Sequence, residues 1–205
     1  MKRTLSALIC AVVSLAAVAA SAGERIYVNG SVRGTLTNYY DIQEYATRVS
    51  LRVNASGSNF YFSGQPCSGS LWRSGNWLSI SGGSVSGNAN RWGDNFSVRV
   101  TVRDPKGGTR PLDFTLYSQG PMDDPKFPPS FWISSGDANL NLRPTFGDRN
   151  YSLSGSVDKE RFGAEGIAVV GLLTAAIIDQ RPREGQPIPK SEWLEQSPVF
   201  RPAFP

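Results

Sequence analysis

The sequence predicts a mainly β protein: an antiparallel sandwich of the immunoglobulin-like or jelly-roll-like type, with a barrel as the alternative. Several segments alternate apolar and polar residues with a period of two, which is typical of strands that bury one face. Stretches rich in Gly, Pro, Ser and Asn separate these segments and favour turns. The segments recur about every ten residues, as in antiparallel β domains. We therefore assign residues 23–157 to one β-sandwich domain.

The first 22 residues are expected to be a secretory signal peptide. Lys2 and Arg3 precede an almost continuous apolar run from Leu5 to Ala20, and Ala20-Ser21-Ala22 fits the small-x-small pattern of a cleavage site. Cleavage after Ala22 leaves 183 residues with 19 basic and 17 acidic side chains, a nearly balanced charge. We therefore expect a periplasmic or secreted protein.

The alternation locates individual strands within the β domain. It is longest at residues 96–103, and the following Asp104-Pro105-Lys106-Gly107-Gly108 predicts a hairpin that joins about 95–103 to about 112–117. Residues 56–94 are expected to form short strands and long polar loops. Shorter alternating runs predict further strands at 48–53, 113–117, 139–142 and 151–153.

Residues 158–180 predict one apolar helix packed on the sandwich. The run from Gly166 to Ile178 contains no charged residue, Asp158 is the expected N-cap, and Pro182 ends the segment. A pair of buried strands and a membrane-inserting segment are the alternatives. The uncharged run is too short for a stable membrane span as a helix.

Residues 181–205 contain six prolines and predict an extended tail. Trp193, Phe200 and Phe204 in this tail are candidate partner-binding residues, because a purely solvated linker has little use for aromatic side chains. The competing interpretation is that they pack on the tail's own domain and cover a sheet edge.

The 205 residues include no histidine, which excludes several kinds of chemistry. There is no Ser-His-Asp triad, Cys-His dyad, histidine base or histidine metal ligand. Cys67 is the one cysteine left after cleavage, and it is expected to be buried, with an intermolecular disulfide through Cys67 as the alternative. The sequence has no run of Lys and Arg that would indicate binding of nucleic acid. We expect no enzymatic activity and no cofactor.

Two groups of side chains could form sites in the loops. A loose calcium site is left open, although no metal site is predicted; its ligands would come from Asp94, Asp123, Asp124 and Asp137. The more suggestive group is aromatic, since an indole ring stacks on a sugar ring while Asn and Asp bind the sugar hydroxyls. The candidate ligand-binding residues are Trp72, Trp77, Trp92, Asn76, Asn90 and Asp94.

A sandwich core often buries a tryptophan, so we expect at least one of the three to be buried, with Trp77 beside Leu78 and Ile80 as the first candidate.

Together these features predict an exported, non-enzymatic binding module of the cell envelope or extracellular space that takes glycans through loop tryptophans. The alternative is a protein-interaction component, either an envelope assembly or secretion accessory or an inhibitor, that acts through the tail and a sheet edge. A third hypothesis is a membrane-active toxin subunit, in which residues 163–178 become exposed.

Overall fold

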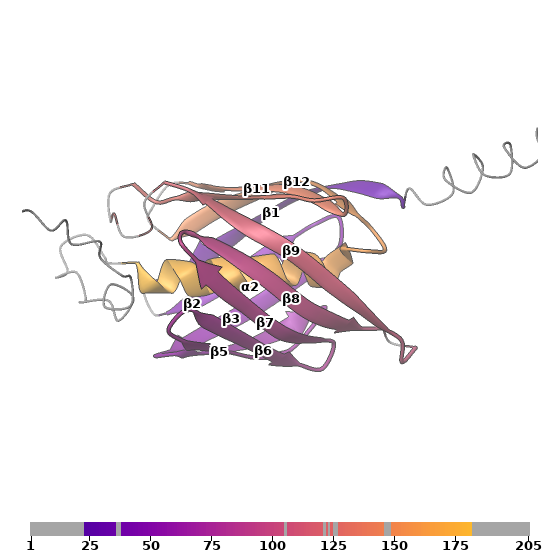
Figure 1. The fold of residues 1–205 in the computed structure, drawn as a ribbon, viewed down its shortest axis with the longest axis horizontal. Coiled ribbons are helices and arrows are strands. Elements are labelled where there is room, and N and C mark those ends of the chain that lie inside the picture. The colour runs from indigo at the N-terminus through magenta and orange to yellow at the C-terminus, as the bar shows by residue number, and fades with distance from the viewer. Residues whose placement is uncertain are drawn as a thin grey trace, which may run out of the picture.

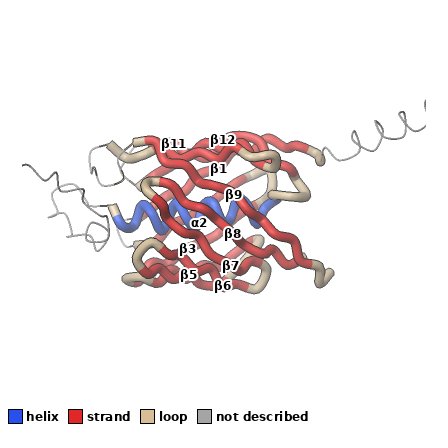
Figure 2. The backbone as a smooth tube through the Cα atoms, in the orientation of Figure 1, coloured by secondary structure: helices blue, strands red, loops and turns tan. Residues whose placement is uncertain are grey.

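A computed structural model describes residues 23–35, 38–104, 106–120, 122, 124, 127–145 and 149–181. These residues form a closed barrel of twelve antiparallel strands with a helix along its interior (Figure 1, Figure 2). The predicted class, mainly antiparallel β with one C-terminal helix, is confirmed. The predicted sandwich is wrong, because the sheet closes on itself. The predicted signal peptide, and the tail after Arg181, lie outside the described residues.

Each strand pairs with the next one along the chain, and the last strand pairs with the first. Closure joins Arg25 to Asp158 and continues to Arg33 opposite Asn150. A closed sheet has no unpaired edge, so the sheet edge of the alternative hypothesis is absent from the described barrel. The strands are β1 (Arg25–Gly34), β2 (Tyr39–Glu44), β3 (Val49–Ser56), β4 (Asn59–Gln65), β5 (Gly69–Ser74), β6 (Trp77–Gly82), β7 (Val85–Trp92), β8 (Asn95–Arg103), β9 (Thr109–Gln119), β10 (Ser130–Ser134), β11 (Ala138–Pro144) and β12 (Asn150–Asp158).

The period-two alternation becomes the two faces of the barrel wall. Along β3 and β8 every second side chain is buried, and the residues between them face solvent or are partly covered. The hairpin predicted from residues 104–108 is confirmed, because β8 and β9 pair from Phe96 opposite Leu116 to Arg103 opposite Thr109.

The stretch 56–94 differs from its prediction of long polar loops. It forms four strands, β4 to β7, joined by short turns. Apolar side chains such as Leu71, Leu78 and Ile80 point inward and are buried, whereas Ser and Asn occupy many outward positions. Polar residues dominate because one face of each strand meets water, so their abundance does not indicate loops.

The helix α2 (Gly163–Gln180) lies inside the barrel with sheet around it (Figure 1). The predicted helix therefore exists, but it does not pack on one face of a sandwich. By length and composition it could cross a membrane, with a mean hydropathy of 1.4, yet 78% of it is buried inside the barrel. A helix that is apolar all round belongs in a core, and each fully buried Val, Leu or Ile contributes about 1.5–3 kcal/mol.

The start of α2 also differs from the prediction, because Asp158 is the last residue of β12. Its carboxylate accepts hydrogen bonds from the backbone N–H groups of Glu160 and Arg161, at 2.9 and 2.8 Å, and so caps the turn before the helix. Phe162 occupies the N-cap position without a capping side chain. Its ring packs on Phe114 with centroids 5.4 Å apart.

The two ends of the barrel are defined by the direction of α2. We call the end at which α2 finishes the exit end. There the phenol of Tyr40 donates to Asp179, and the guanidinium of Arg73 donates to the carbonyl of Ala176. At the opposite end, the entry end, Arg110 forms an ion pair of 3.1 Å with Glu165. Because strands alternate in direction, the turns β3–β4, β5–β6 and β7–β8 all lie at the exit end.

Candidate functional site

The three predicted tryptophans all lie on the outer wall of the barrel. Trp72 on β5, Trp77 on β6 and Trp92 on β7 are 48%, 43% and 60% exposed. The expectation that at least one is buried is wrong. Each occupies an outward position, and the inward positions beside them belong to smaller side chains such as Leu78 and Ala89.

Strand register places these tryptophans in a line with Tyr61. Tyr61 pairs with Ser70, two residues before Trp72. Trp72 pairs with Ser79, two residues after Trp77, and Trp77 pairs with Asn90, two residues before Trp92. Each step therefore moves one strand across and two residues toward the exit end, about 8 Å between Cα atoms. We call Tyr61, Trp72, Trp77 and Trp92 the aromatic row.

Tyr61 is a member of this row that the sequence reasoning missed. Its signal was present, because Phe60 and Phe62 alternate with it and are buried while Tyr61 is exposed. Sequence alone does not reveal that β4 lies beside β5 in this register. The line of four aromatic side chains therefore appears only in the folded sheet.

Uncharged polar residues flank every member of the aromatic row. A direct cross-strand partner has its Cβ about 4.5–5.5 Å away, close enough for its side chain to reach a ligand stacked on the ring. Among the described strand partners of the row, all carry hydroxyl or carboxamide groups. These partners are Asn54 and Ser70 for Tyr61, Asn59 and Ser79 for Trp72, Ser74 and Asn90 for Trp77, and Asn95 for Trp92.

The predicted polar ligand-binding residues occupy different positions around the row. Asn90 lies directly opposite Trp77. Asn76 is exposed in the β5–β6 turn, and its carbonyl accepts a hydrogen bond of 2.8 Å from the backbone N–H of Arg91. Asp94 lies in the β7–β8 turn, where its carboxylate forms an ion pair of 3.2 Å with Arg91. Of the three, Asn90 is thus the best placed to contact a ligand stacked on Trp77.

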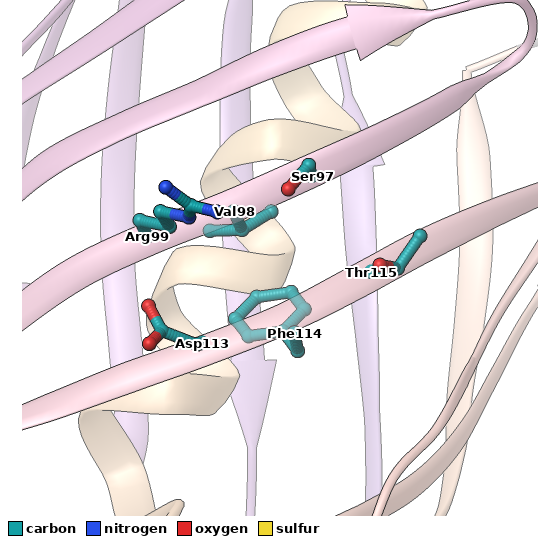
Figure 3. Close-up of a pocket in the computed structure, with 6 residues that line it drawn as sticks. All are labelled: Ser97, Val98, Arg99, Asp113, Phe114 and Thr115. Carbon is teal, nitrogen blue, oxygen red and sulfur yellow. The ribbon is translucent and has the colours of Figure 1, made fainter.

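A shallow, open depression adjoins the row on the wall formed by β8 and β9. Its outward lining consists of Ser97 opposite Thr115 and Arg99 opposite Asp113, as Figure 3 shows. Val98 and Phe114 complete the lining. Ser97 also pairs with Asn90 on β7, so the depression begins one strand beyond the partner of Trp77.

The structure does not support the calcium site that the sequence left open and does not describe the predicted partner-binding residues. The candidate partner-binding residues Trp193, Phe200 and Phe204 lie outside the described residues, as does Asp123. Of the remaining calcium candidates, Asp94 and Asp137 belong to turns at opposite ends of the barrel, so they cannot share an ion. No group of three or more Cys, Asp or Glu side chains in the described part of the chain could hold a metal ion.

Cys67 lies in the connection between β4 and β5 and is 4% exposed, which confirms the buried interpretation. Burial, with a smaller effect from the carboxylate of Glu165, raises the pKa of its thiol to about 12. An intermolecular disulfide through Cys67 is therefore disfavoured, since exchange needs an accessible thiolate.

Comparisons with known proteins identify no relative of this chain: no family model, no curated protein and no solved structure matches it.

Proposed function

We propose that this protein is an exported, non-catalytic binding module that takes uncharged glycans on the aromatic row. The observation that carries the proposal is the line of four exposed aromatic side chains, each with hydroxyl or carboxamide partners on the neighbouring strands. Apolar ring faces and uncharged hydrogen-bonding groups are the two features that a sugar surface requires.

Stacking is favoured by the position of the row on regular strands. Trp72 and Trp77 project from β5 and β6, whose backbones are held by pairing on both sides. A tryptophan has two rotatable side-chain bonds, so it presents a large area at a small cost in conformational entropy. The row therefore provides a preorganised surface, which improves affinity for a weakly interacting ligand.

The polar partners favour a neutral ligand. Charged side chains are absent from the described direct partners of the row. Two ion pairs lie on neighbouring strand and turn positions, Arg91 with Asp94 and Arg52 with Asp41, and in each the two charges compensate one another. Binding of single-stranded nucleic acid combines aromatic stacking with a positively charged groove, and the row has no such groove. Polar outward residues on both sides also favour a ligand met in water over a lipid interface, where aromatic girdles border an apolar band.

The test is a glycan array that includes bacterial envelope polysaccharides, probed with residues 23–205. We expect binding to uncharged glycans. Trp77→Ala should weaken the affinity about tenfold or more, because removal of an aromatic side chain at the centre of a binding surface commonly has an effect of this size. Trp72→Ala and Trp92→Ala are also expected to weaken glycan binding. Because these side chains are exposed, the thermal midpoint should stay close to that of the unaltered protein.

Tyr27→Ala is the matched control. Tyr27 is 87% exposed on β1, outside the row, and pairs with Ser156. Its removal deletes an exposed aromatic ring with a hydroxyl neighbour but leaves the row intact, so binding should not change. Equal binding by the Trp77→Ala variant and the unaltered protein would contradict the proposal.

Binding of a protein partner remains the alternative function, but it would not use a sheet edge, because the described barrel is closed. Trp and Tyr are enriched at protein interfaces, so the same row could contact a protein if the array binds no sugar. The membrane-active hypothesis would require α2 to leave a barrel in which 78% of it is buried.

A further inference from the structure

The outer wall carries a second aromatic group beyond the aromatic row. Tyr117 on β9 and Trp132 on β10 are direct cross-strand partners. Their rings stack with centroids 4.3 Å apart and planes inclined by 19°. Trp132 remains exposed although one of its faces meets Tyr117. We call these two residues the stacked pair.

One strand, β8, separates the row from the stacked pair near the exit end of the barrel. Trp92 pairs with Asn95 at the start of β8. The side-chain oxygen of Asn95 accepts a hydrogen bond of 3.2 Å from the backbone N–H of Ser118, the residue after Tyr117. Trp92 and Trp132 thus lie three strands apart, about 14 Å along the wall, with Asn95 and Tyr117 between them.

The surface between the two groups is polar. A second line of cross-strand partners runs from Trp77 to Asn90, Ser97 and Thr115. Ser97 and Thr115 line the shallow depression seen in Figure 3. Beyond the stacked pair, Trp132 faces Asn141 on β11. A sugar chain that crosses from one aromatic group to the other would therefore meet hydroxyl and carboxamide groups along the way.

We infer that the stacked pair is a second subsite for the glycan bound by the row, and that the ligand is an uncharged polysaccharide chain rather than a single terminal sugar. This inference rests on the proposed function. Five aromatic residues from Trp72 to Trp132, spread over β5 to β10, provide more stacking positions than a mono- or disaccharide would occupy.

The shape of the wall narrows the class of polysaccharide. The path crosses the strands of a closed barrel, so it follows a convex surface. A flat crystalline face would touch such a surface at few of these rings, whereas a single flexible chain in solution bends to follow them. The ligand class is therefore a soluble, uncharged, flexible polysaccharide.

The test measures affinity as a function of chain length. Size-fractionated oligosaccharides from amylose, laminarin and dextran, from disaccharides to decasaccharides, are titrated into residues 23–205 by calorimetry. Affinity should rise with length until the chain reaches the stacked pair. Trp132→Ala should weaken the longest chains about tenfold and leave the shortest chains unchanged, whereas Trp77→Ala should weaken chains of every length.

The outcomes separate this inference from the proposed function. Binding that is independent of chain length, or unaffected by Trp132→Ala at every length, would overturn the second subsite and leave the row as the site. Absence of binding to all three oligosaccharide series and to every glycan on the array would overturn both. Tyr27→Ala again serves as the control for loss of an exposed aromatic ring.

Discussion

The phenol of Tyr40 donates a hydrogen bond of 2.8 Å to the carboxylate of Asp179. Tyr40 belongs to β2 and is fully buried, and Asp179 is the second-last residue of α2. This contact joins one of the first strands of the barrel to the end of the helix that the barrel encloses. It holds the polar C-terminal end of α2 at the exit end of the barrel.

Tyr40→Phe should therefore lower the free energy of unfolding by about 1.5–3 kcal/mol, because it removes one hydrogen bond to a charged group while the ring stays in place. Urea denaturation followed by tryptophan fluorescence measures the change. Tyr39→Phe is the matched control, since Tyr39 is the adjacent residue but its ring is exposed. Equal stability of the two variants would contradict the role assigned to this contact.

Gly171 should be intolerant of larger side chains, because α2 approaches the barrel wall closely there. A Cβ atom at this position would lie 2.5 Å from Cγ2 of Ile42. Gly171→Val is expected to destabilise the fold by about 1–3 kcal/mol through overpacking. Ile42→Ala alone should also destabilise the fold, by about 2–5 kcal/mol, but it removes the atoms that a larger side chain at position 171 would meet, so the two substitutions together should cost less than their sum. Additive losses in urea denaturation would argue against direct contact.

The ionisation of Cys67 predicts how stability falls in alkaline solution. Burial raises the pKa of this thiol from 9.0 to about 12 in the folded protein, so between these values only the unfolded chain releases the proton. Deprotonation then favours unfolding, and the contribution of Cys67 to the free energy of unfolding should fall by about 1.4 kcal/mol per pH unit between pH 9 and pH 12.

Cys67→Ala isolates this contribution from the other groups that titrate in the same range. The difference in unfolding free energy between the unaltered protein and the variant should shrink as pH rises from 9 to 12. A constant difference would show that the folded thiol ionises as readily as the unfolded one. Reaction with a thiol reagent at pH 8 should likewise be slow until denaturant is added.

The strands and the helix could be predicted from local pattern because alternation decides which side chains are buried. In β8 the buried set of Phe96, Val98, Val100 and Val102 is the one that the period of two selects. Strands β4 to β7 are harder to predict from the sequence. This stretch is rich in Ser, Asn and Gly, which have a weak preference for strands and are common in loops. Their strand character depends on buried partners such as Leu71 and Ile80.

The sequence suggested the tryptophans of the proposed site but not the local structure that carries them. The sequence predicts Trp72, Trp77 and Trp92 in loops with at least one of them buried, whereas all three are exposed on strands of the outer wall. Tyr61, Tyr117 and Trp132 are not among the residues predicted from the sequence, because only strand register brings them near the tryptophans. A pairing shift of one residue would move these side chains to the other face of the sheet.

By itself, the sequence determined that each strand has an apolar face to bury and that one apolar helix follows the strands. It also determined that no chemistry based on histidine is available. Tertiary structure alone decided that Arg25 pairs with Asp158, so that the sheet closes and surrounds α2. The reason is that alternation specifies two faces for a strand but not its partner. Partner choice depends on closing the sheet around a helix of matching size, which no local stretch of sequence contains.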